Sequence, residues 1–296
     1  MTPKPDIAGG GLRFVAAGIL LTALVGAALG VDNGPQPTAA LLTGHGEAAT
    51  NVRTAPACAS GTPYQQYLQA LAPGPTLWWR FGEAAGAASA ADASGNGNPG
   101  TVIGAQLGGA GLVQCDATGA LGLPGGGPDT GLVYLPGSRP APKQLTVALW
   151  LQAAPGSAGG LFTFADAAAS TATTTDRSVA ITAAGRVSFT IETTSGTTQL
   201  SSSVVDGDVA DGRPHLVVAT LGPGAGVGVH DVRLYLDGQP VDGATGLTLP
   251  PSYTGYWRTG SGTGAAAPAA LDEISLWEGA ALDATQVAAL AAADHW

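Results

Sequence analysis

Cysteine, methionine and charged side chains are scarce in this chain of 296 residues. It has two cysteines, one methionine and only 11% charged residues. Because no Cys-x-x-Cys pair occurs, neither a dithiol redox centre nor a thiolate zinc site is indicated. No cluster of Lys and Arg is present, and the formal net charge is −10. An acidic surface repels phosphate groups, so the composition argues against nucleic acid as a partner and against adsorption to anionic lipid.

Several signatures of catalytic sites are also missing. The chain has no Gly-x-Ser-x-Gly elbow and no Gly-Lys-Ser/Thr phosphate loop. Glycoside hydrolysis needs two carboxylates about 5–10 Å apart, and on one strand such a pair comes from positions i and i+2 or i+4. Asp272 and Glu273 are adjacent, so we expect them on opposite faces of a strand, and Glu192 stands alone. No catalytic residue is therefore predicted, and we expect the chain not to be an enzyme.

One long uncharged run is present, at the N-terminus. Lys4 and Arg13 precede the run, residues 14–31, which ends in small residues. This pattern is typical of a secretory signal peptide spanning residues 1–31, although the run is also close to the lower length limit of a membrane anchor. Both interpretations place the rest of the chain outside the cytoplasm, secreted or at the cell surface.

The two cysteines fit an oxidising compartment. An even number of cysteines in an exported chain predicts that Cys58 and Cys115 form a disulfide, and the alternative is two buried free thiols. A loop of this length would stabilise the fold by roughly 4 kcal/mol. Residues 32–60 are small and polar without periodicity, which predicts a linker. Residues 61–296 are expected to form one domain.

Two short helices are predicted near the ends of this domain. Thr62 and Gln65 match a capping box, which predicts a helix that begins at Pro63. A second capping box begins at Asp283 and predicts a helix through about residue 292. Val287 and Leu290 are the apolar residues expected to dock this helix onto the core.

Between the helices, short apolar stretches alternate with clusters of Gly, Pro, Asn and Asp. This pattern predicts an all-β fold, an antiparallel two-sheet jelly-roll sandwich, and no helical periodicity suggests interleaved βαβ units. Asp237-Gly238 predicts a tight hairpin, and Gly185-Arg186 predicts a second one. The expected strands are residues 77–81, 132–135, 146–152, 161–164, 178–182, 187–193, 215–221, 232–236, 256–258 and 271–277.

Five stretches also occur in a characteristic order. They are Leu-Trp-Trp-Arg-Phe-Gly-Glu at 77–83 with Asp-Ala-Ser-Gly-Asn-Gly-Asn at 92–98, the strand 145–152, Asp-Gly-Arg-Pro-His-Leu-Val-Val-Ala at 211–219, Arg-Leu-Tyr-Leu-Asp-Gly at 233–238, and Ala-Leu-Asp-Glu-Ile-Ser-Leu-Trp at 270–277. Together they resemble the laminin-G-like, concanavalin A-like lectin/glucanase family over residues 63–293. The resemblance implies two curved sheets with the first and last strands adjacent. Pro214, Leu216 and Ala148 differ from the family's usual Trp, His and Glu.

The resemblance also implies a calcium site at the rim of the fold. The loop 92–98 concentrates carboxylate, amide and carbonyl oxygens, the ligands that Ca²⁺ prefers. The predicted ligands are Glu83, Asp92, Asn98 and Asp272. The alternative for the loop is an ordinary Asx turn with solvated carboxylates.

Three aromatic residues form the best candidate for a sugar-binding cluster. Tyr253, Tyr256 and Trp257 follow a Pro-Pro pair, and pyranose rings stack on exposed aromatic rings. The alternative is that they pack within the fold, as we expect for Trp79 and Trp150. His215 is expected to be packed and hydrogen-bonded rather than catalytic.

These observations predict a secreted or cell-surface lectin-like binding module that recognises carbohydrate or protein at the cell envelope. One alternative is a structural or interaction domain of a surface assembly without a small ligand. A glycoside hydrolase is the third alternative, which the lack of a carboxylate pair disfavours.

Overall fold

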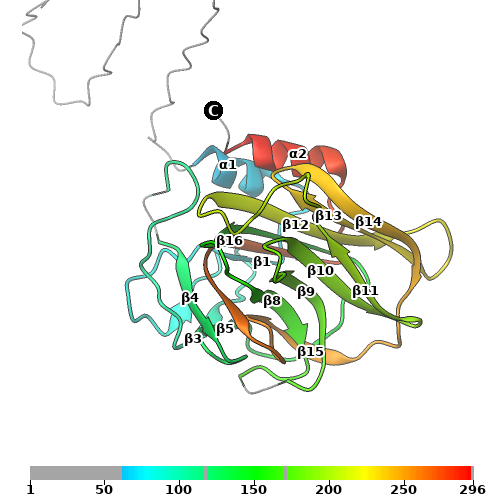
Figure 1. Ribbon diagram of the computed structural model, residues 1–296, viewed down its shortest axis with the longest axis horizontal. Coiled ribbons are helices and arrows are strands. Elements are labelled where there is room, and N and C mark those ends of the chain that lie inside the picture. The colour runs from blue at the N-terminus through cyan, green and yellow to red at the C-terminus, as the bar shows by residue number, and fades with distance from the viewer. Residues whose placement is uncertain (1–61, 117–118, 170–171, 295–296) are drawn as a thin grey trace, which may run out of the picture. The chain divides into compact units, whose positions relative to one another are not determined.

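The computed structural model describes residues 62–116, 119–169 and 172–294 (Figure 1). The predicted signal peptide or anchor, the linker and Cys58 lie outside these residues. The described residues all belong to one compact unit, Arg53–Trp296. Within them, no helix combines the length and the apolar character needed to cross a membrane.

The described unit contains two short helices, and strands make up most of the rest. Each helix begins at its predicted capping box. The elements are α1 Pro63–Ala70, β1 Leu77–Trp79, β2 Ser89–Ala90, β3 Gly100–Ile103, β4 Leu121–Gly126, β5 Leu132–Tyr134, β6 Arg139–Pro140, β7 Leu145–Gln152, β8 Gly159–Ala165, β9 Thr175–Ile181, β10 Val187–Thr193, β11 Gly196–Ser201, β12 Pro214–Pro223, β13 Val229–Leu236, β14 Gln239–Thr248, β15 Thr254–Thr259, β16 Ala266–Glu278 and α2 Ala284–Ala292.

The strands form two layers, as the sequence predicts. Sheet I has the order β14-β13-β12-β7-β16, and β1 and β4 also pair with β16. Sheet II runs β11-β10-β9-β8-β15-β5-β3-β2, and β6 pairs with β15. A parallel bridge between Ala266 of β16 and Gly160 of β8 connects the two layers. The first and last strands are adjacent, because β1 pairs with β16 in the register Leu77↔Leu276.

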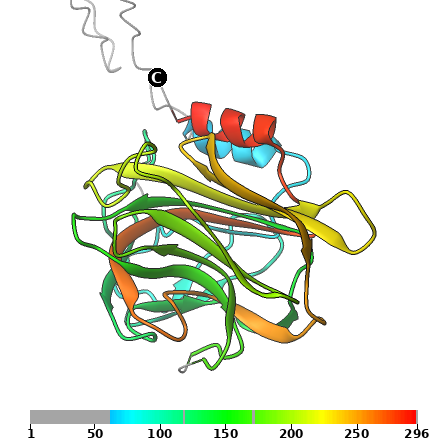
Figure 2. The same cartoon turned by 45° about the vertical axis from the view of Figure 1, so that its right-hand side comes forward.

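The central strands of sheet I are buried on both faces. Side chains of successive strand residues point to opposite faces, so Leu149 and Leu151 of β7 pack into the core between the sheets, whereas Ala148 and Trp150 face outward. The outward residues are buried as well, because α1 and α2 cover this face (Figure 2). Tyr64 of α1, for example, contacts Trp150 edge to face with ring centroids 5.7 Å apart.

The hairpin between β13 and β14 is confirmed. Asp237 and Gly238 have φ values of 50° and 80°, the positive values that a primed two-residue turn requires at both positions. The residues that flank the turn, Leu236 and Gln239, pair directly. The turn therefore fixes the register of a hairpin whose inward residues, such as Leu234, lie in the main core.

Candidate functional site

The three aromatic residues of the predicted sugar-binding cluster do not lie together on the surface. Trp257 has no exposed surface, and its ring stacks on Phe162 with centroids 5.3 Å apart and an interplanar angle of 3°. Its indole N–H donates to Glu278 at 2.9 Å. Trp257 therefore belongs to the core, because its position on β15 points inward, and no ligand can stack on it.

The two tyrosines of that cluster differ from each other. Tyr253 packs against Phe164 with ring centroids 5.6 Å apart, and its hydroxyl donates to Asp176 at 3.2 Å. Burial raises the pKa of Tyr253 well above its usual value. Tyr256 pairs with Ala165 of β8 and remains half-buried on the outer face of sheet II. Tyr256 is thus the member of the predicted cluster with a partly open ring.

The predicted calcium ligand Asp92 is occupied by hydrogen bonds from the protein. Its Oδ1 accepts from the backbone N–H groups of Trp78 at 2.9 Å and Ser94 at 3.0 Å, and its Oδ2 accepts from Ser94 Oγ and from Asn98 N, each at 2.8 Å. Partial burial raises the pKa of Asp92, but these hydrogen bonds outweigh it and lower the pKa. The loop 92–98 therefore has the Asx-turn geometry that was the alternative to a metal site.

The other three predicted ligands do not complete a set around this loop. Glu83 accepts from the backbone of Ala91 at 2.7 Å and so lies beside the loop. The side-chain oxygen of Asn98 accepts a hydrogen bond from Arg139, a cation that repels a metal ion. Asp272 belongs to a different acidic group. Calcium binding by this chain stays a prediction from the sequence.

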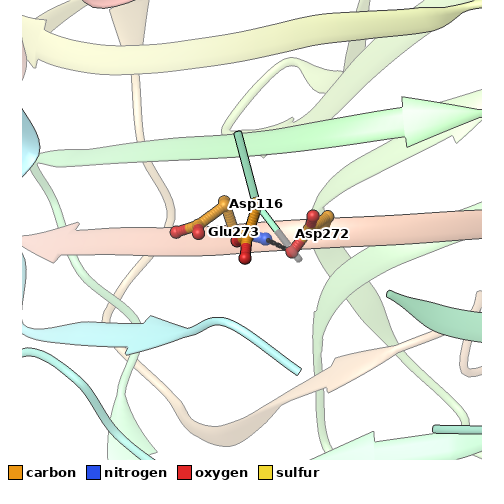
Figure 3. Close-up of side chains that lie close together, drawn as sticks. All are labelled: Asp116, Asp272 and Glu273. Atoms are coloured by element: carbon orange, nitrogen blue, oxygen red, sulfur yellow. Dashed lines mark hydrogen bonds between the residues drawn. The ribbon is translucent and has the colours of Figure 1, made fainter. Parts of the chain in front are cut away.

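That acidic group is a buried cluster of Asp116, Asp272 and Glu273 (Figure 3). One oxygen atom from each carboxylate lies within 4.8 Å of the others, and it is the one such group of three in the part of the chain that the structure describes. The expectation that Asp272 and Glu273 lie on opposite faces is wrong. The register of β16 shifts between Asp272 and Ser275, and Glu273 has a φ of 51°. This bulge brings both carboxylates to the same place.

Glu273 and Asp116 connect the cluster to α1 and β1. The side-chain amide of Gln65 donates to Glu273 at 2.6 Å and to Asp116 at 2.7 Å. Glu273 also accepts from the indole N–H of Trp78. Arg80 completes the network, with its Nε 3.4 Å from Glu273 and its Nη2 3.6 Å from Asp116. A single arginine therefore pairs with two of the three acidic groups.

Burial of Asp272 and Glu273 favours the neutral forms of these two carboxyl groups. Desolvation, together with the charge of Glu273, raises the pKa of Asp272 to about 8. Desolvation also raises the pKa of Glu273 to about 7, although hydrogen bonds from Gln65 and Trp78 oppose it. Neither Asp272 nor Glu273 has exposed surface, so a substrate cannot reach this carboxylate pair. The cluster holds α1, the loop before residue 117 and β16 together.

His215 is hydrogen-bonded, as expected. Its Nδ1 lies 2.8 Å from Asp237, and its Nε2 lies 3.2 Å from Asp211. The bond to Asp237 is the main reason that the pKa of His215 is raised, with burial opposing it. Asp237 also accepts from the backbone of Leu216 at 2.9 Å. His215 thus fastens the hairpin turn to the start of β12.

A shallow hollow on the outer face of sheet II is open to ligands. We call it the sheet II hollow; its volume is about 270 Å³. Thr190 and Ser178 pair across β10 and β9, and Glu192 follows two residues after Thr190 on the same face. Ser178 bonds to the hydroxyl of Thr163, and Glu192 accepts from Thr197 at 2.8 Å. The polar residues of its wall are Thr175, Ser178, Thr190, Glu192, Ser261 and Thr263.

Sequence analysis missed this hollow because its residues belong to no motif. The available signal was the alternation of apolar and polar side chains along β9 and β10. It places the polar residues Ser178, Thr190 and Glu192 on one face, and the apolar residues Val179, Phe189 and Ile191 on the other. Which outward face stays open depends on where the helices pack, and that is not encoded in a local pattern.

The geometry defines a jelly-roll sandwich with one sheet covered by helices and the other open. The chain belongs to the concanavalin A-like lectin/glucanases superfamily, whose family model matches residues 126–288, more than half of the chain. No curated protein sequence matches it. The family membership agrees with the resemblance in the sequence.

Solved structures with a similar fold include binding domains of toxins. The binding domain of Paraclostridial Mosquitocidal Protein 1 has a TM-score of 0.53 and 12% identity, over 73% of this chain and 51% of that chain. The ligand binding domain of botulinum neurotoxin serotype D, in complex with N-acetylneuraminic acid, has a TM-score of 0.51 and 9% identity, over 78% and 52%. The chain thus spans about half the length of these structures, and the likeness is one of fold.

Proposed function

We propose that this chain is a non-catalytic carbohydrate-binding module that acts outside the cytoplasm. The observation that carries the proposal is the sheet II hollow, in which hydroxyl groups and one carboxylate converge on an open face. Hydroxyl and carboxylate groups are suitable partners for the hydroxyls of a sugar. The volume, about 270 Å³, lies just below the range of about 300–1,000 Å³ typical of ligand sites, so it suits a single sugar unit.

The charges of the hollow argue against glycoside hydrolysis. That reaction needs two carboxylates on either side of the bond, and Glu192 is the one acidic residue of the wall. The pair Asp272 and Glu273 is buried away from any ligand. A carboxylate without a second one can orient a sugar through hydrogen bonds but cannot supply both the acid and the base.

The fold and the N-terminal sequence both support the proposal. A domain of this fold has been solved with N-acetylneuraminic acid, so the fold is compatible with carbohydrate binding. The N-terminal pattern of residues 14–31 supports a location outside the cytoplasm, either secreted or anchored at the cell surface. A protein ligand at the cell envelope, or a structural role in a surface assembly, is the alternative.

A glycan array with the full chain, followed by calorimetry with the best hit, tests the proposal. We expect Thr190→Val to weaken binding by roughly threefold to tenfold, because it removes one hydroxyl of the hollow while keeping the shape of the side chain. Thr248→Val is the matched control, since Thr248 is exposed on β14 and does not line the hollow. No hit on the array would favour the structural role. If Thr190→Val and Thr248→Val bind the sugar with equal affinity, the sugar does not bind in the sheet II hollow.

A further inference from the structure

A larger hollow lies on the outer face of sheet I, at the start of α2. We call it the Arg233 hollow; its volume is about 410 Å³. Its floor comes from β12 and β13, where Thr220 pairs with Arg233 and Gly222 pairs with Asp231. Cross-strand partners share a face of the sheet, so the side chains of Thr220, Arg233 and Asp231 point outward, to the face on which Tyr235 packs with residues of α2. Helix α2 lies over this face of the sheet (Figure 1).

The unusual group in this hollow is Arg233. Every other arginine in the described residues contacts a carboxylate or a backbone carbonyl; Arg80 and Arg258, for example, reach Glu273 and Asp129. The arginines that form ion pairs with carboxylates are Arg80, Arg139, Arg177, Arg213 and Arg258. Arg186 donates a hydrogen bond to the backbone carbonyl of Gly207. Arg233 is exposed and has neither kind of partner among the described residues. In a chain of net charge −10, Arg233 is therefore an arginine whose guanidinium is available to a ligand.

Two acidic residues line the same hollow without pairing with Arg233. Asp283 is the N-cap of α2 and accepts from Gln286 N at 2.9 Å, and Asp231 accepts from Gly246 N at 3.1 Å. Neither lies within the 4.0 Å of Arg233 that an ion pair requires. The hollow therefore holds a cationic hydrogen-bond donor, Arg233, and two carboxylate acceptors, Asp231 and Asp283, that do not pair with it.

The rest of the wall is apolar. Pro223, Pro240 and Leu282 contribute to it, and Tyr235, which is 2% exposed, lies in the floor. Apolar walls with a few polar groups in fixed places are typical of small-molecule sites, and the volume falls within their usual range of about 300–1,000 Å³.

We propose that the Arg233 hollow binds a sugar that carries a carboxylate, such as a uronic acid unit. The guanidinium of Arg233 has the planar fork that a carboxylate matches with two parallel hydrogen bonds. Asp231 and Asp283 are placed to accept hydrogen bonds from the hydroxyls of the same ring. The two acidic residues disfavour an acidic peptide, because successive carboxylates would meet like charge. The site is on the opposite face from the sheet II hollow and does not depend on it.

Two sugars that differ at one group test whether the carboxylate is what the Arg233 hollow recognises. Calorimetric titration of the full chain with D-glucuronate and with D-glucose compares a carboxylate with a hydroxymethyl group on the same ring. We expect glucuronate to bind at least about tenfold more tightly, the effect of one charged hydrogen-bonded pair. Arg233→Gln should remove this preference. Arg213→Gln is the matched control, because Arg213 is exposed outside the hollow and should leave the preference unchanged.

The outcomes separate this proposal from its alternatives. A preference for glucuronate that Arg233→Gln abolishes and Thr190→Val leaves intact supports the Arg233 hollow, whatever the result at the sheet II hollow. Equal binding of both sugars by the wild-type chain, or a preference that survives in Arg233→Gln, would overturn it. Binding of a glutamate-rich peptide through Arg233, with no binding of glucuronate, would also overturn it.

Discussion

The side chain of Glu273 connects three separate segments of the fold. It accepts hydrogen bonds from Gln65 on α1 and Trp78 on β1, and it lies 3.4 Å from Arg80 Nε. Buried polar groups of this kind are costly unless every partner is in place. The groups that face the cluster from all sides are Asp116, Asp272, Glu273, Arg80, Tyr64 and Asp294. With one arginine among them, the charge of the cluster is sensitive to pH.

The cluster predicts how stability depends on pH. Burial raises the pKa of Asp272 to about 8 and of Glu273 to about 7, whereas both groups titrate near pH 4 in an unfolded chain. Between about pH 4 and pH 8 the folded state therefore binds more protons than the unfolded state. The free energy of unfolding should fall as pH rises through this window, by up to about 1.4 kcal/mol per pH unit for each proton. Urea denaturation at a series of pH values measures it.

Glu273→Gln gives the comparison for this prediction, because it removes one titrating group without removing the side chain. Its unfolding free energy should depend less steeply on pH than that of the wild-type chain, whatever its absolute stability. His215, whose pKa is also raised, contributes in the same direction in both proteins and cancels in the comparison. Identical pH slopes would contradict the prediction.

At the scale of elements, α1 depends on its N-terminal cap. Thr62 Oγ1 accepts from Gln65 N at 3.0 Å, and the side chain of Gln65 accepts from Thr62 N at 3.4 Å. We expect Thr62→Ala to lower the free energy of unfolding by about 1 kcal/mol, since it leaves a helix N–H without its partner. Chemical denaturation measures the change. Thr62→Ser keeps the hydroxyl and should stay close to wild type; equal losses in both variants would show that the methyl group matters instead.

The elements that sequence analysis did not predict share a physical feature. Most residues of β11 and β14 are partly or fully exposed, and these strands form the outer edges of the two sheets. β4 contains Pro124 and ends in Gly125 and Gly126. Such strands exist because a neighbour offers hydrogen bonds, and they need no alternation of apolar side chains. Most strands that bury a face were predicted; β3, which lies between β5 and β2 and packs Val102 against the core, was not.

At the scale of the whole molecule, the two proposed hollows lie on the outer faces of opposite sheets. One short glycan cannot reach both at once. A module with two separate sites would instead connect two glycan chains, and its apparent affinity for a surface would exceed that of either site alone. The cover of helices over sheet I makes this arrangement possible, because the start of α2 forms one wall of the Arg233 hollow.

The predicted disulfide also concerns the whole molecule. Cys58 lies outside the described residues, so its pairing with Cys115 stays a prediction. The intact mass of the exported chain should be lower by two hydrogen atoms than the mass after reduction. Cys115→Ser should lower the free energy of unfolding by roughly 4 kcal/mol or less under non-reducing conditions. A free thiol in the exported protein would contradict both the disulfide and the oxidising compartment that it implies.

The sequence by itself determined the local structure and the class of fold. The capping boxes at Thr62 and Asp283 determined both helix starts, and alternation and turn residues such as Asp237-Gly238 determined most of the inner strands, since these signals act over a few neighbouring residues. Only the tertiary structure decided that Trp257 faces the core and that a bulge at Glu273 joins two carboxylates. It also decided which outer face stays open, because these outcomes depend on contacts between segments far apart in the chain.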